Sequence, residues 1–341
     1  MVERMIKKDL ISIILPVFNK ELTIEKCITS ILRQSYSNYE LIIINDGSTD
    51  NSLDKILKYK NFNNIKILNK SNEGVSKARN FGLKHANGMY VAFIDADDTI
   101  EKNYLEDLKR GYDTGADLSI IGFNEISGRQ IVSRSSYNNE FTTNVKVLNH
   151  IFDFDGPLGY VWNKLWKVQI IKDHNIYFDE NIKIAEDLLF NIQYLGYVKK
   201  VYINGAHEYN YFKDGSGLSK SFYIGKKDGQ FVDDYLNYKS AANKILKEYH
   251  KIAKYSQDLE IKNAEANMVQ INLSLLRNLR LNHIDKKALI KKVKEENLDY
   301  QNSYFTSNMS TSSKKAIFLL TMYLPRLMEL IDSIHSSYLK K

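Results

Sequence analysis

The clearest chemical signal in this chain is a pair of acidic side chains directly behind an apolar run. Asp95 and Asp97 follow the run at residues 90–94, and Asp98 comes immediately after them. In an open α/β sheet, ligands bind beyond the carboxyl ends of the strands. Two carboxylates one residue apart can hold one divalent cation, so the pattern predicts a metal and phosphate site. The alternative is a solvated turn or a helix cap.

Two earlier segments end strands in a comparable way. Pro16, Val17, Phe18 and Asn19 follow the first apolar run, and residues 45–50 follow the second. Asp46 ends its predicted strand just before a glycine, so its carboxylate could accept hydrogen bonds from a base or ribose while the chain turns away. Together with the acidic triplet, these loops predict a nucleotide pocket.

A fourth segment adds positive charge to this predicted pocket. Gly74 precedes a helix start, and Lys77 and Arg79 follow within the first turns. A glycine at a helix N-terminus with nearby cations suits a pyrophosphate or a base edge. The alternative for both cations is surface ion pairing, and this alternative fits Lys77 better.

Alternating strands and helices must position these loops. The apolar spacing predicts strands at 10–15, 39–44, 65–68 and 89–94, with helices at 23–34, 52–60 and 75–85. This order predicts a mostly parallel sheet flanked by helices. A further strand is expected at 118–123, a surface excursion at 133–144, and a helix that Glu186 and Asp187 open, where acids suit the N-terminus.

The last third of the chain has a different character. No glycine occurs beyond Gly229 and the only proline there is Pro325, so this region is predicted to be mostly helical, with a domain boundary near Gly225. An apolar seam of Ile317, Leu320, Leu324, Leu327, Ile331, Ile334 and Tyr338 would need a partner surface, and Pro325 should interrupt it. Internal packing, self-association and contact with a bilayer are the three alternatives.

Composition narrows the classes of protein. A chain of 341 residues with 43% hydrophobic content can bury a full core. The single Cys27 excludes an internal disulfide framework and fits a reducing compartment. The first ten residues contain no apolar signal region, and no eighteen apolar residues run together, so we expect a cytoplasmic protein without a membrane span.

The net charge of +7 lies in the last third. Residues 1–224 hold 28 basic and 28 acidic side chains, whereas residues 225–341 hold 20 and 13. Such a basic region either faces an anionic surface, such as the inner face of the cell membrane, or consists of solvated lysines on helices. Because zinc-ligand clusters and RNA-binding signatures are lacking, nucleic acid is not a predicted partner.

Four segments in order carry a family resemblance: ISIILPVFNKE, YELIIINDGSTDNS, NEGVSKARNFGL and YVAFIDADD. They resemble the family 2 glycosyltransferases, which have the Rossmann-like GT-A fold. A second patch, WNKLWK at 162–167 and FDENIKIAEDLLF at 178–190, is similar to the acceptor half of bacterial members that build surface polysaccharides. The resemblance implies a catalytic domain at 1–224, with a donor half at about 1–115 and an acceptor half at about 116–224. A helical domain at 225–341 would contact membrane or a second copy.

The resemblance also implies donor-side roles. The donor would be a nucleotide-sugar, usually a UDP-sugar, with Asp46 reading uracil, Arg79 near the base or diphosphate, and uridine lined by Pro16, Val17, Phe18 and Asn19. Asp95, Ala96 and Asp97 match the metal motif, in which the second acid usually ligates Mn²⁺ or Mg²⁺ and the first contacts ribose or a metal-bound water. A bridging ion would stabilise the leaving diphosphate. His207 is a further candidate ligand or diphosphate contact.

On the acceptor side, Asp187 aligns with the general base that deprotonates the incoming hydroxyl, which gives inversion at the anomeric carbon. At a helix N-terminus its anionic form is expected to be favoured. Glu186 would orient the acceptor, and Trp162, Asn163 and Lys164 are the predicted acceptor contacts. The acceptor would be a glycan or a lipid-linked glycan.

The predicted function is therefore inverting, metal-dependent transfer of a hexosyl or N-acetylhexosaminyl group in polysaccharide synthesis. A sugar nucleotidyltransferase would need a glycine-rich basic signature after the first strand, and a dehydrogenase would need GxGxxG, and neither pattern is present. A non-catalytic sugar- or nucleotide-binding assembly subunit with the same fold is the other alternative.

Overall fold

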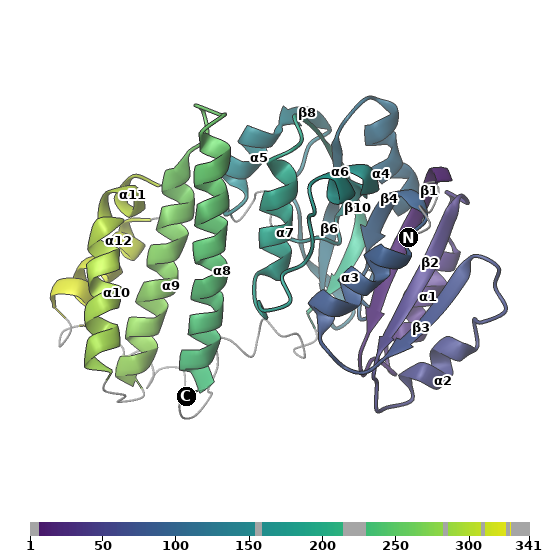
Figure 1. Cartoon of the computed structure of the whole chain (residues 1–341), viewed down its shortest axis with the longest axis horizontal. Coiled ribbons are helices and arrows are strands. Elements are labelled where there is room, and N and C mark those ends of the chain that lie inside the picture. The colour runs from purple at the N-terminus through teal and green to yellow at the C-terminus, as the bar shows by residue number, and fades with distance from the viewer. Residues whose placement is uncertain are drawn as a thin grey trace. The chain divides into compact units, whose positions relative to one another are not determined.

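The structure is a computed structural model that describes residues 7–153, 159–213, 230–281, 286–307, 311–324 and 328. The chain divides into two compact units (Figure 1). The first comprises Met1–Ile151 with Asp155–Gly217, and the second comprises Phe152–Phe154 with Leu218–Lys341. The predicted boundary near Gly225 lies outside the described residues.

One sheet runs through the first unit in the order β3-β2-β1-β4-β9-β6-β10-β5, with β7 beside β6 and β8 beside β10. Strands β3, β2, β1 and β4 are parallel neighbours, and β6 is parallel to β10. Strand β9 lies antiparallel between β4 and β6 and joins these two parallel groups. The strands are β1 (Lys7–Val17), β2 (Tyr39–Asp46), β3 (Ile65–Lys70), β4 (Gly88–Phe93), β5 (Thr99–Ile100), β6 (Leu118–Ser127), β7 (Gln130–Arg134), β8 (Glu140–Thr143), β9 (Lys164–Lys167) and β10 (Lys200–Phe212).

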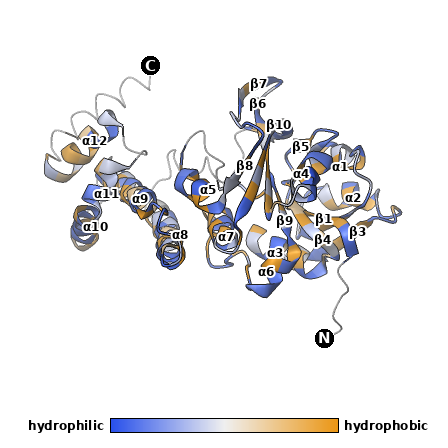
Figure 2. Ribbon diagram, turned by 90° about the horizontal axis from the view of Figure 1, so that it is seen from above, coloured by the Kyte–Doolittle hydropathy of each residue, from blue (hydrophilic) through white to orange (hydrophobic). Residues whose placement is uncertain are grey.

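Helices cover both faces of this sheet, with α1, α2 and α4 on one side and α3 and α6 on the other (Figure 2). Alternate residues of β1 serve the two faces: Ile13 packs in the cluster that contains Ile28 of α1, whereas Ile14 faces α3. A Cβ at Gly82 would lie 2.5 Å from Ile14 Cγ2, so this glycine permits the close packing of α3. The helices are α1 (Ile24–Leu32), α2 (Ser52–Leu57), α3 (Val75–His85), α4 (Tyr104–Asp113), α5 (Asn144–His150), α6 (Val168–Asp173) and α7 (Glu186–Leu195).

The predicted α/β class and the first seven elements are confirmed. The sheet is mixed rather than simply parallel, because β5, β7, β8 and β9 all pair antiparallel. Strand β8 and the last two residues of β7 lie in the stretch at 133–144 that was expected to be a surface excursion. Their side chains are mostly exposed, so they lack the apolar alternation that marks a half-buried strand.

The second unit is helical in its described part, as predicted. Its core is formed by Ala266, Val269 and Leu276 of α9 with Val293 of α10 and Phe318 of α12. A buried polar contact also joins α8 to α9, in which the Tyr235 hydroxyl donates to Asn272 Oδ1 at 2.7 Å. The helices are α8 (Gln230–Ala253), α9 (Ile261–Leu281), α10 (Lys287–Asp299), α11 (Gln301–Thr306) and α12 (Ser312–Tyr323).

The predicted apolar seam is only partly described, and its register differs from the prediction. On α12 the buried apolar residues are Phe318 and Met322, whereas Ile317 is 38% exposed and Leu324, just beyond the helix, is 54% exposed. Helix α12 ends two residues before Pro325, and Pro325 and the later seam residues lie outside the described residues. Among the helices described, none has the length and apolar character of a membrane span.

Candidate functional site

Arg79 joins the two groups of predicted acids. Its guanidinium, 4% exposed on α3, donates to Asp95 Oδ1 at 3.0 Å and to Glu186 Oε1 at 3.1 Å. Asp95 follows β4 and Glu186 begins α7, so one side chain links the segment after β4 to the start of α7. The guanidinium carbon also lies 5.1 Å from the Phe178 ring centroid. Because Arg79 is committed to two carboxylates, its role at a donor base or diphosphate stays a prediction.

Burial decides the electrostatics of Glu186 and Asp187. It raises the pKa of Glu186, the Asp187 carboxylate adds to this shift, and Arg79 opposes it. Burial also raises the pKa of Asp187, against the opposing effects of Arg79 and of the Leu188 amide, which donates to Asp187 Oδ1 at 2.9 Å. As expected at a helix N-terminus, the Leu188 amide favours the Asp187 anion. The helix amide is in place, but desolvation outweighs it, and a raised pKa makes Asp187 a stronger base.

The three predicted acceptor residues are buried. Trp162 is 3% exposed, while Asn163 and Lys164 are 0% exposed. The Trp162 ring stacks on Tyr209 at 4.2 Å and on Tyr160 at 4.6 Å between ring centroids. These contacts use the ring faces that a sugar would need, so the burial does not support a direct acceptor contact, and that role stays a prediction.

Lys164 instead belongs to a buried polar network that includes Asn191 of α7. Its ammonium donates to the Tyr160 carbonyl at 2.6 Å and to Asn163 Oδ1 at 2.8 Å. Burial lowers the pKa of Lys164 to about 7, and Asp187 opposes this shift. Asn191 of α7 also donates to the Tyr160 carbonyl at 3.3 Å and to the Asp187 carbonyl at 2.8 Å. A buried polar network therefore supports the turn that carries Asp187.

Asp46 organises the loop before α3. Its Oδ1 accepts from Lys70 Nζ at 2.7 Å and from the Glu73 amide at 3.1 Å, and its Oδ2 accepts from the Gly74 amide at 2.9 Å. Gly74 has φ +94°, a conformation that side chains rarely adopt. The Asp46 carboxylate already has three donors, and its contact with uracil stays a prediction.

The loop after β1 is hydrogen-bonded to the loop after β2. Pro16 and Val17 form the end of β1, whereas Phe18 is 42% exposed and offers an aromatic face. The Asn19 amide donates to Ser48 Oγ at 3.1 Å, and Asn19 Oδ1 accepts from the Thr49 amide at 2.8 Å. These bonds hold the predicted uridine loop against residues 48 and 49.

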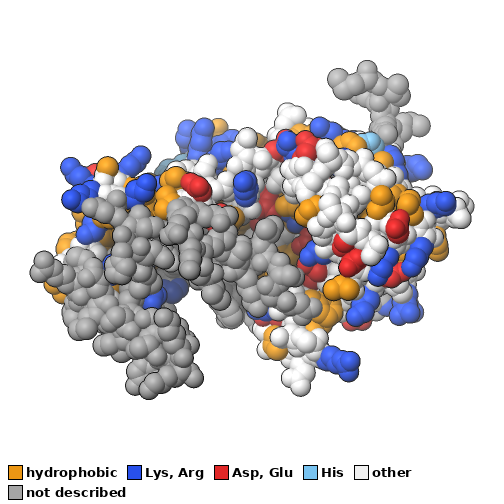
Figure 3. Space-filling model, turned by 90° about the horizontal axis from the view of Figure 1, so that it is seen from below, with side chains coloured by type: hydrophobic (Ala, Val, Ile, Leu, Met, Phe, Trp, Pro, Cys, Tyr) orange, Lys and Arg blue, Asp and Glu red, His pale blue; other side chains and the backbone are white. Residues whose placement is uncertain are grey.

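Lys20, in the same loop, forms an ion pair with Asp97. Its Nζ lies 2.5 Å from Asp97 Oδ2, and both side chains are about one-third exposed, at 27% and 32%. Its backbone amide donates to Ser52 Oγ at 2.7 Å, so Lys20 links the loops after β1, β2 and β4. In the space-filling view, acidic and basic side chains lie in close alternation on one face of this unit (Figure 3).

The donor set is compatible with a divalent cation that substrate helps to hold. Asp95 and Asp97 keep 30% and 32% of their side chains exposed. Across the described parts of the chain, no group of three or more His, Cys, Asp or Glu side chains is arranged to hold a metal. Mg²⁺ characteristically uses one or two carboxylates with waters and substrate phosphates, so the two acids suffice for such an ion. The His207 Nε2 is 2.8 Å from the Ser135 carbonyl, and its role as a ligand stays a prediction.

Several site residues were not predicted from the sequence. Asp98, 1% exposed, accepts from the Tyr209 hydroxyl at 2.7 Å and from the Phe212 amide at 2.9 Å. Burial raises the pKa of Asp98 well above its usual range. The triplet of acids signalled Asp98 without separating its role from those of its neighbours. Lys20 lay within the family-like segment, but nothing in the sequence marked it as a partner of Asp97.

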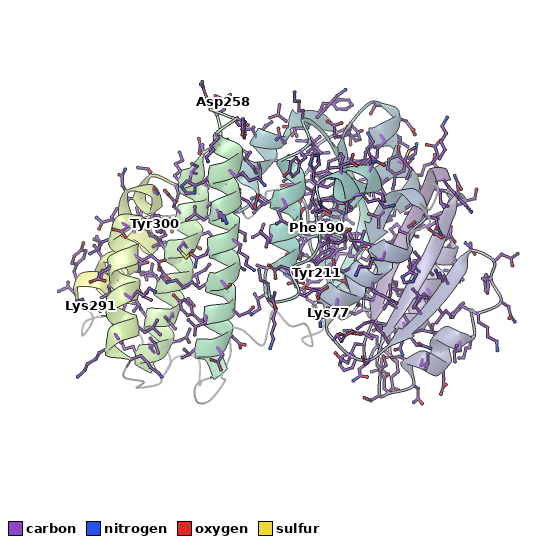
Figure 4. All side chains as sticks on the ribbon, in the orientation of Figure 1. Lys77, Phe190, Tyr211, Asp258, Lys291 and Tyr300 are labelled. Carbon is purple, nitrogen blue, oxygen red and sulfur yellow. The ribbon has the colours of Figure 1, made fainter. Side chains whose placement is uncertain are left out.

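Three of the elements around the site can be located in Figure 4, in which Lys77 lies on α3, Phe190 on α7 and Tyr211 on β10. A mixed α/β sheet with acids after β4 beside acids at the start of α7 is the arrangement expected of a glycosyltransferase. The sequence profile described as "Glycosyl transferase family 2" matches residues 12–166. TarP of Staphylococcus aureus, a poly(ribitol-phosphate) beta-N-acetylglucosaminyltransferase, is 32% identical over 264 residues, covering 73% of this chain and 79% of TarP. This chain belongs to glycosyl transferase family 2.

Other similarities are more partial. Glycosyltransferase GlyA of Streptococcus pneumoniae is 33% identical over 212 residues, which is 59% of this chain and 30% of GlyA. The matched region therefore spans less than a third of that longer relative. A crystal structure of S. aureus TarS 1–349 in complex with UDP-GlcNAc superposes with a TM-score of 0.59 at 22% identity, covering 88% of this chain and 90% of that one. This likeness confirms the predicted GT-A class of fold.

Proposed function

We propose that this protein transfers a sugar from a UDP-sugar to a hydroxyl of a glycan or lipid-linked glycan, with inversion and with a divalent cation. The contact that carries the proposal is the Arg79 bridge between Asp95 and Glu186. It joins Asp95, one of the two proposed metal-binding carboxylates, to Glu186, the neighbour of the proposed base Asp187. Family membership supports this assignment.

The proposed roles follow from exposure and hydrogen bonding. Phe18 offers an exposed ring for a base, and Asn19 fixes the loop that carries it. Asp187 would accept the proton of the incoming hydroxyl, and its raised pKa favours that step. Arg79 holds Glu186 in place beside it. Asp97 and Asp95 would hold Mn²⁺ or Mg²⁺, which when bound stabilises the negative charge of the leaving diphosphate.

The first donor to test is UDP-GlcNAc, because a TarS structure contains it and TarP is named for N-acetylglucosaminyl transfer. The purified full chain would be incubated with UDP-GlcNAc, UDP-glucose, UDP-galactose and GDP-mannose, each with Mn²⁺ or with EDTA. Poly(ribitol phosphate) serves as one acceptor, as in the name of TarP. We expect Mn²⁺-dependent release of UDP from one UDP-sugar, increased by acceptor.

Binding of UDP without turnover under every condition would favour the alternative of a non-catalytic assembly subunit. Release of nucleotide from GDP-mannose alone would contradict the proposed uridine specificity. Nucleotidyl transfer, the other alternative, would release pyrophosphate from UTP and a sugar phosphate. A parallel incubation with UTP and a sugar phosphate would detect that pyrophosphate.

We further propose that the enzyme works in the cytoplasm and that residues 225–341 form its docking domain. This proposal rests on the excess of basic residues there and on the apolar seam. The full chain and a form lacking residues 314–341 would be compared by flotation with anionic liposomes and by molecular mass in solution. Loss of flotation would support membrane docking, and loss of a dimer would support self-association. Unchanged behaviour in both assays would contradict the proposal.

A further inference from the structure

The backbone of the acid loop, residues 95–98, is held from two sides. On the α1 side, the Thr23 hydroxyl donates to the Ala96 carbonyl at 2.9 Å and Cys27 Sγ lies 3.6 Å from the Asp95 carbonyl. On the β10 side, the Asp95 amide donates to the Tyr209 hydroxyl at 3.3 Å. The loop that presents Asp95 and Asp97 is therefore located by side chains from separate elements.

Tyr209 is itself rigidly placed. It is 0% exposed, and it is paired with Ile100 of β5 and with Phe123 of β6. Its ring stacks on Trp162 with an interplanar angle of 14°. Two strand partners and a stacked indole fix the direction of the phenol, so the position of its hydroxyl is determined by the sheet rather than by the loop.

Asp98 completes this link. One of its oxygens accepts from the Tyr209 hydroxyl and the other accepts from the amide of Phe212, the last residue of β10. The third acid of the triplet thus turns inward and binds the end of β10, while Asp95 and Asp97 stay partly exposed. Because Asp98 is buried and both of its oxygens accept hydrogen bonds, its role differs from that of a metal ligand.

We propose that Asp98 and Tyr209 form a positioning pair that sets the acid loop against the end of β10 and so sets the geometry for binding the nucleotide diphosphate. This inference rests on the proposed function. Binding groups must be held within about 0.5 Å of their productive positions by supporting hydrogen bonds, and the Tyr209 hydroxyl supplies two such bonds at once. Its removal would leave the Asp95 amide and one Asp98 oxygen without their buried partner.

The test compares two tyrosines of the same cluster. Tyr209→Phe removes the hydroxyl that contacts the loop, whereas Tyr104→Phe removes an equally buried hydroxyl that donates to the Trp162 carbonyl. The measurement is the Kd for UDP in Mn²⁺ by titration calorimetry, with urea stability measured in parallel. We expect the Kd to rise about five- to tenfold for Tyr209→Phe and less than twofold for Tyr104→Phe, with both variants less stable; a tenfold change corresponds to about 1.4 kcal/mol.

A second variant alters the contact on the α1 side of the acid loop and is expected to disturb folding less. Thr23→Val removes the bond to the Ala96 carbonyl and should raise the Kd for UDP about two- to threefold. If Tyr209→Phe bound UDP like the wild type, or if Tyr104→Phe weakened binding equally, the positioning role would be overturned. If Tyr209→Phe did not fold, an unchanged Kd in Thr23→Val would overturn it. A wild-type protein that did not bind UDP at all would refute the proposed function instead, and this inference with it.

Discussion

Replacing Arg79 with methionine tests the central bridge of the site through stability rather than activity. The change keeps the length of an apolar stem and removes the charge that lies between Asp95 and Glu186. Breaking a buried ion pair by removing one partner costs about 3–5 kcal/mol. Because the Glu186 side chain is only 12% exposed, the loss of its pair should approach this cost. Asp95 is 30% exposed, so the loss of its pair should cost at most about 1 kcal/mol.

Protonation of Glu186 limits the stability lost in Arg79→Met and makes that loss depend on pH. Burial and Asp187 raise the pKa of Glu186 to about 7, above its usual 4.5, and Arg79 restrains that rise. Without Arg79 the pKa of Glu186 in the folded state rises further. Glu186 therefore stays protonated to a higher pH in the folded protein than in the unfolded chain. For such a group, stability falls as the pH rises above the unfolded value. We expect Arg79→Met to lose about 3 kcal/mol at pH 8 and about 1 kcal/mol at pH 5.

Tryptophan fluorescence during urea unfolding is a suitable assay, because the chain has 2 tryptophans and both Trp162 and Trp166 lie in the first unit. The signal therefore follows that unit without a contribution from the helical one. Lys77→Met is the matched control, since Lys77 lies on the same helix but forms an exposed pair with Glu73, and exposed pairs contribute little to stability. A loss for Arg79→Met that is equal at both pH values, or larger at pH 5, would refute this reasoning.

Three further substitutions separate the proposed roles. Asp97→Ala should weaken Mn²⁺-dependent UDP binding about tenfold or more in calorimetry, and unchanged binding would argue against a ligand role. Asp187→Asn should lower the rate of sugar transfer by about 10²–10⁴ while the Kd for UDP stays within about twofold, and turnover at the wild-type rate would show that another group is the base. Lys20→Met should tighten Mn²⁺ binding about three- to fivefold, because an exposed ion pair worth up to about 1 kcal/mol no longer competes for Asp97. Lys58→Met, which breaks the exposed pair with Glu25, should leave that affinity unchanged, and weaker Mn²⁺ binding to Lys20→Met would contradict the competition.

Most of the strands and helices before Asp95 could be predicted because β1, β2 and β4 are continuous apolar runs and α1 has apolar residues at helical spacing. Helix α3 was predicted with the observed bounds, since Gly74 marks its start and the apolar spacing ends at His85. Strand β9 could not be predicted in the same way. It has only four residues, and its pairing with β4 and β6 depends on contacts that are distant in sequence.

Residue types indicated the chemistry of the site but not which side chains would be buried. Trp162 was predicted at the acceptor, whereas its ring fills an aromatic stack whose members come from two separate segments of the chain. Asp187 was expected to be favoured as an anion, because helix position is visible in a sequence while desolvation is not. Asp98 had the same residue type as Asp95, and only the end of β10 distinguishes its role.

The place of β9 in the sheet bears on how the chain is made. Until residues 164–167 leave the ribosome, the edge of β4 and residues 119–120 of β6 lack the neighbour that β9 will supply. Unpaired edges of this kind invite association with other chains. A fragment that stops before Lys164 should therefore aggregate more readily than one that also contains β9, and β6 gains its longest partner only when β10 follows.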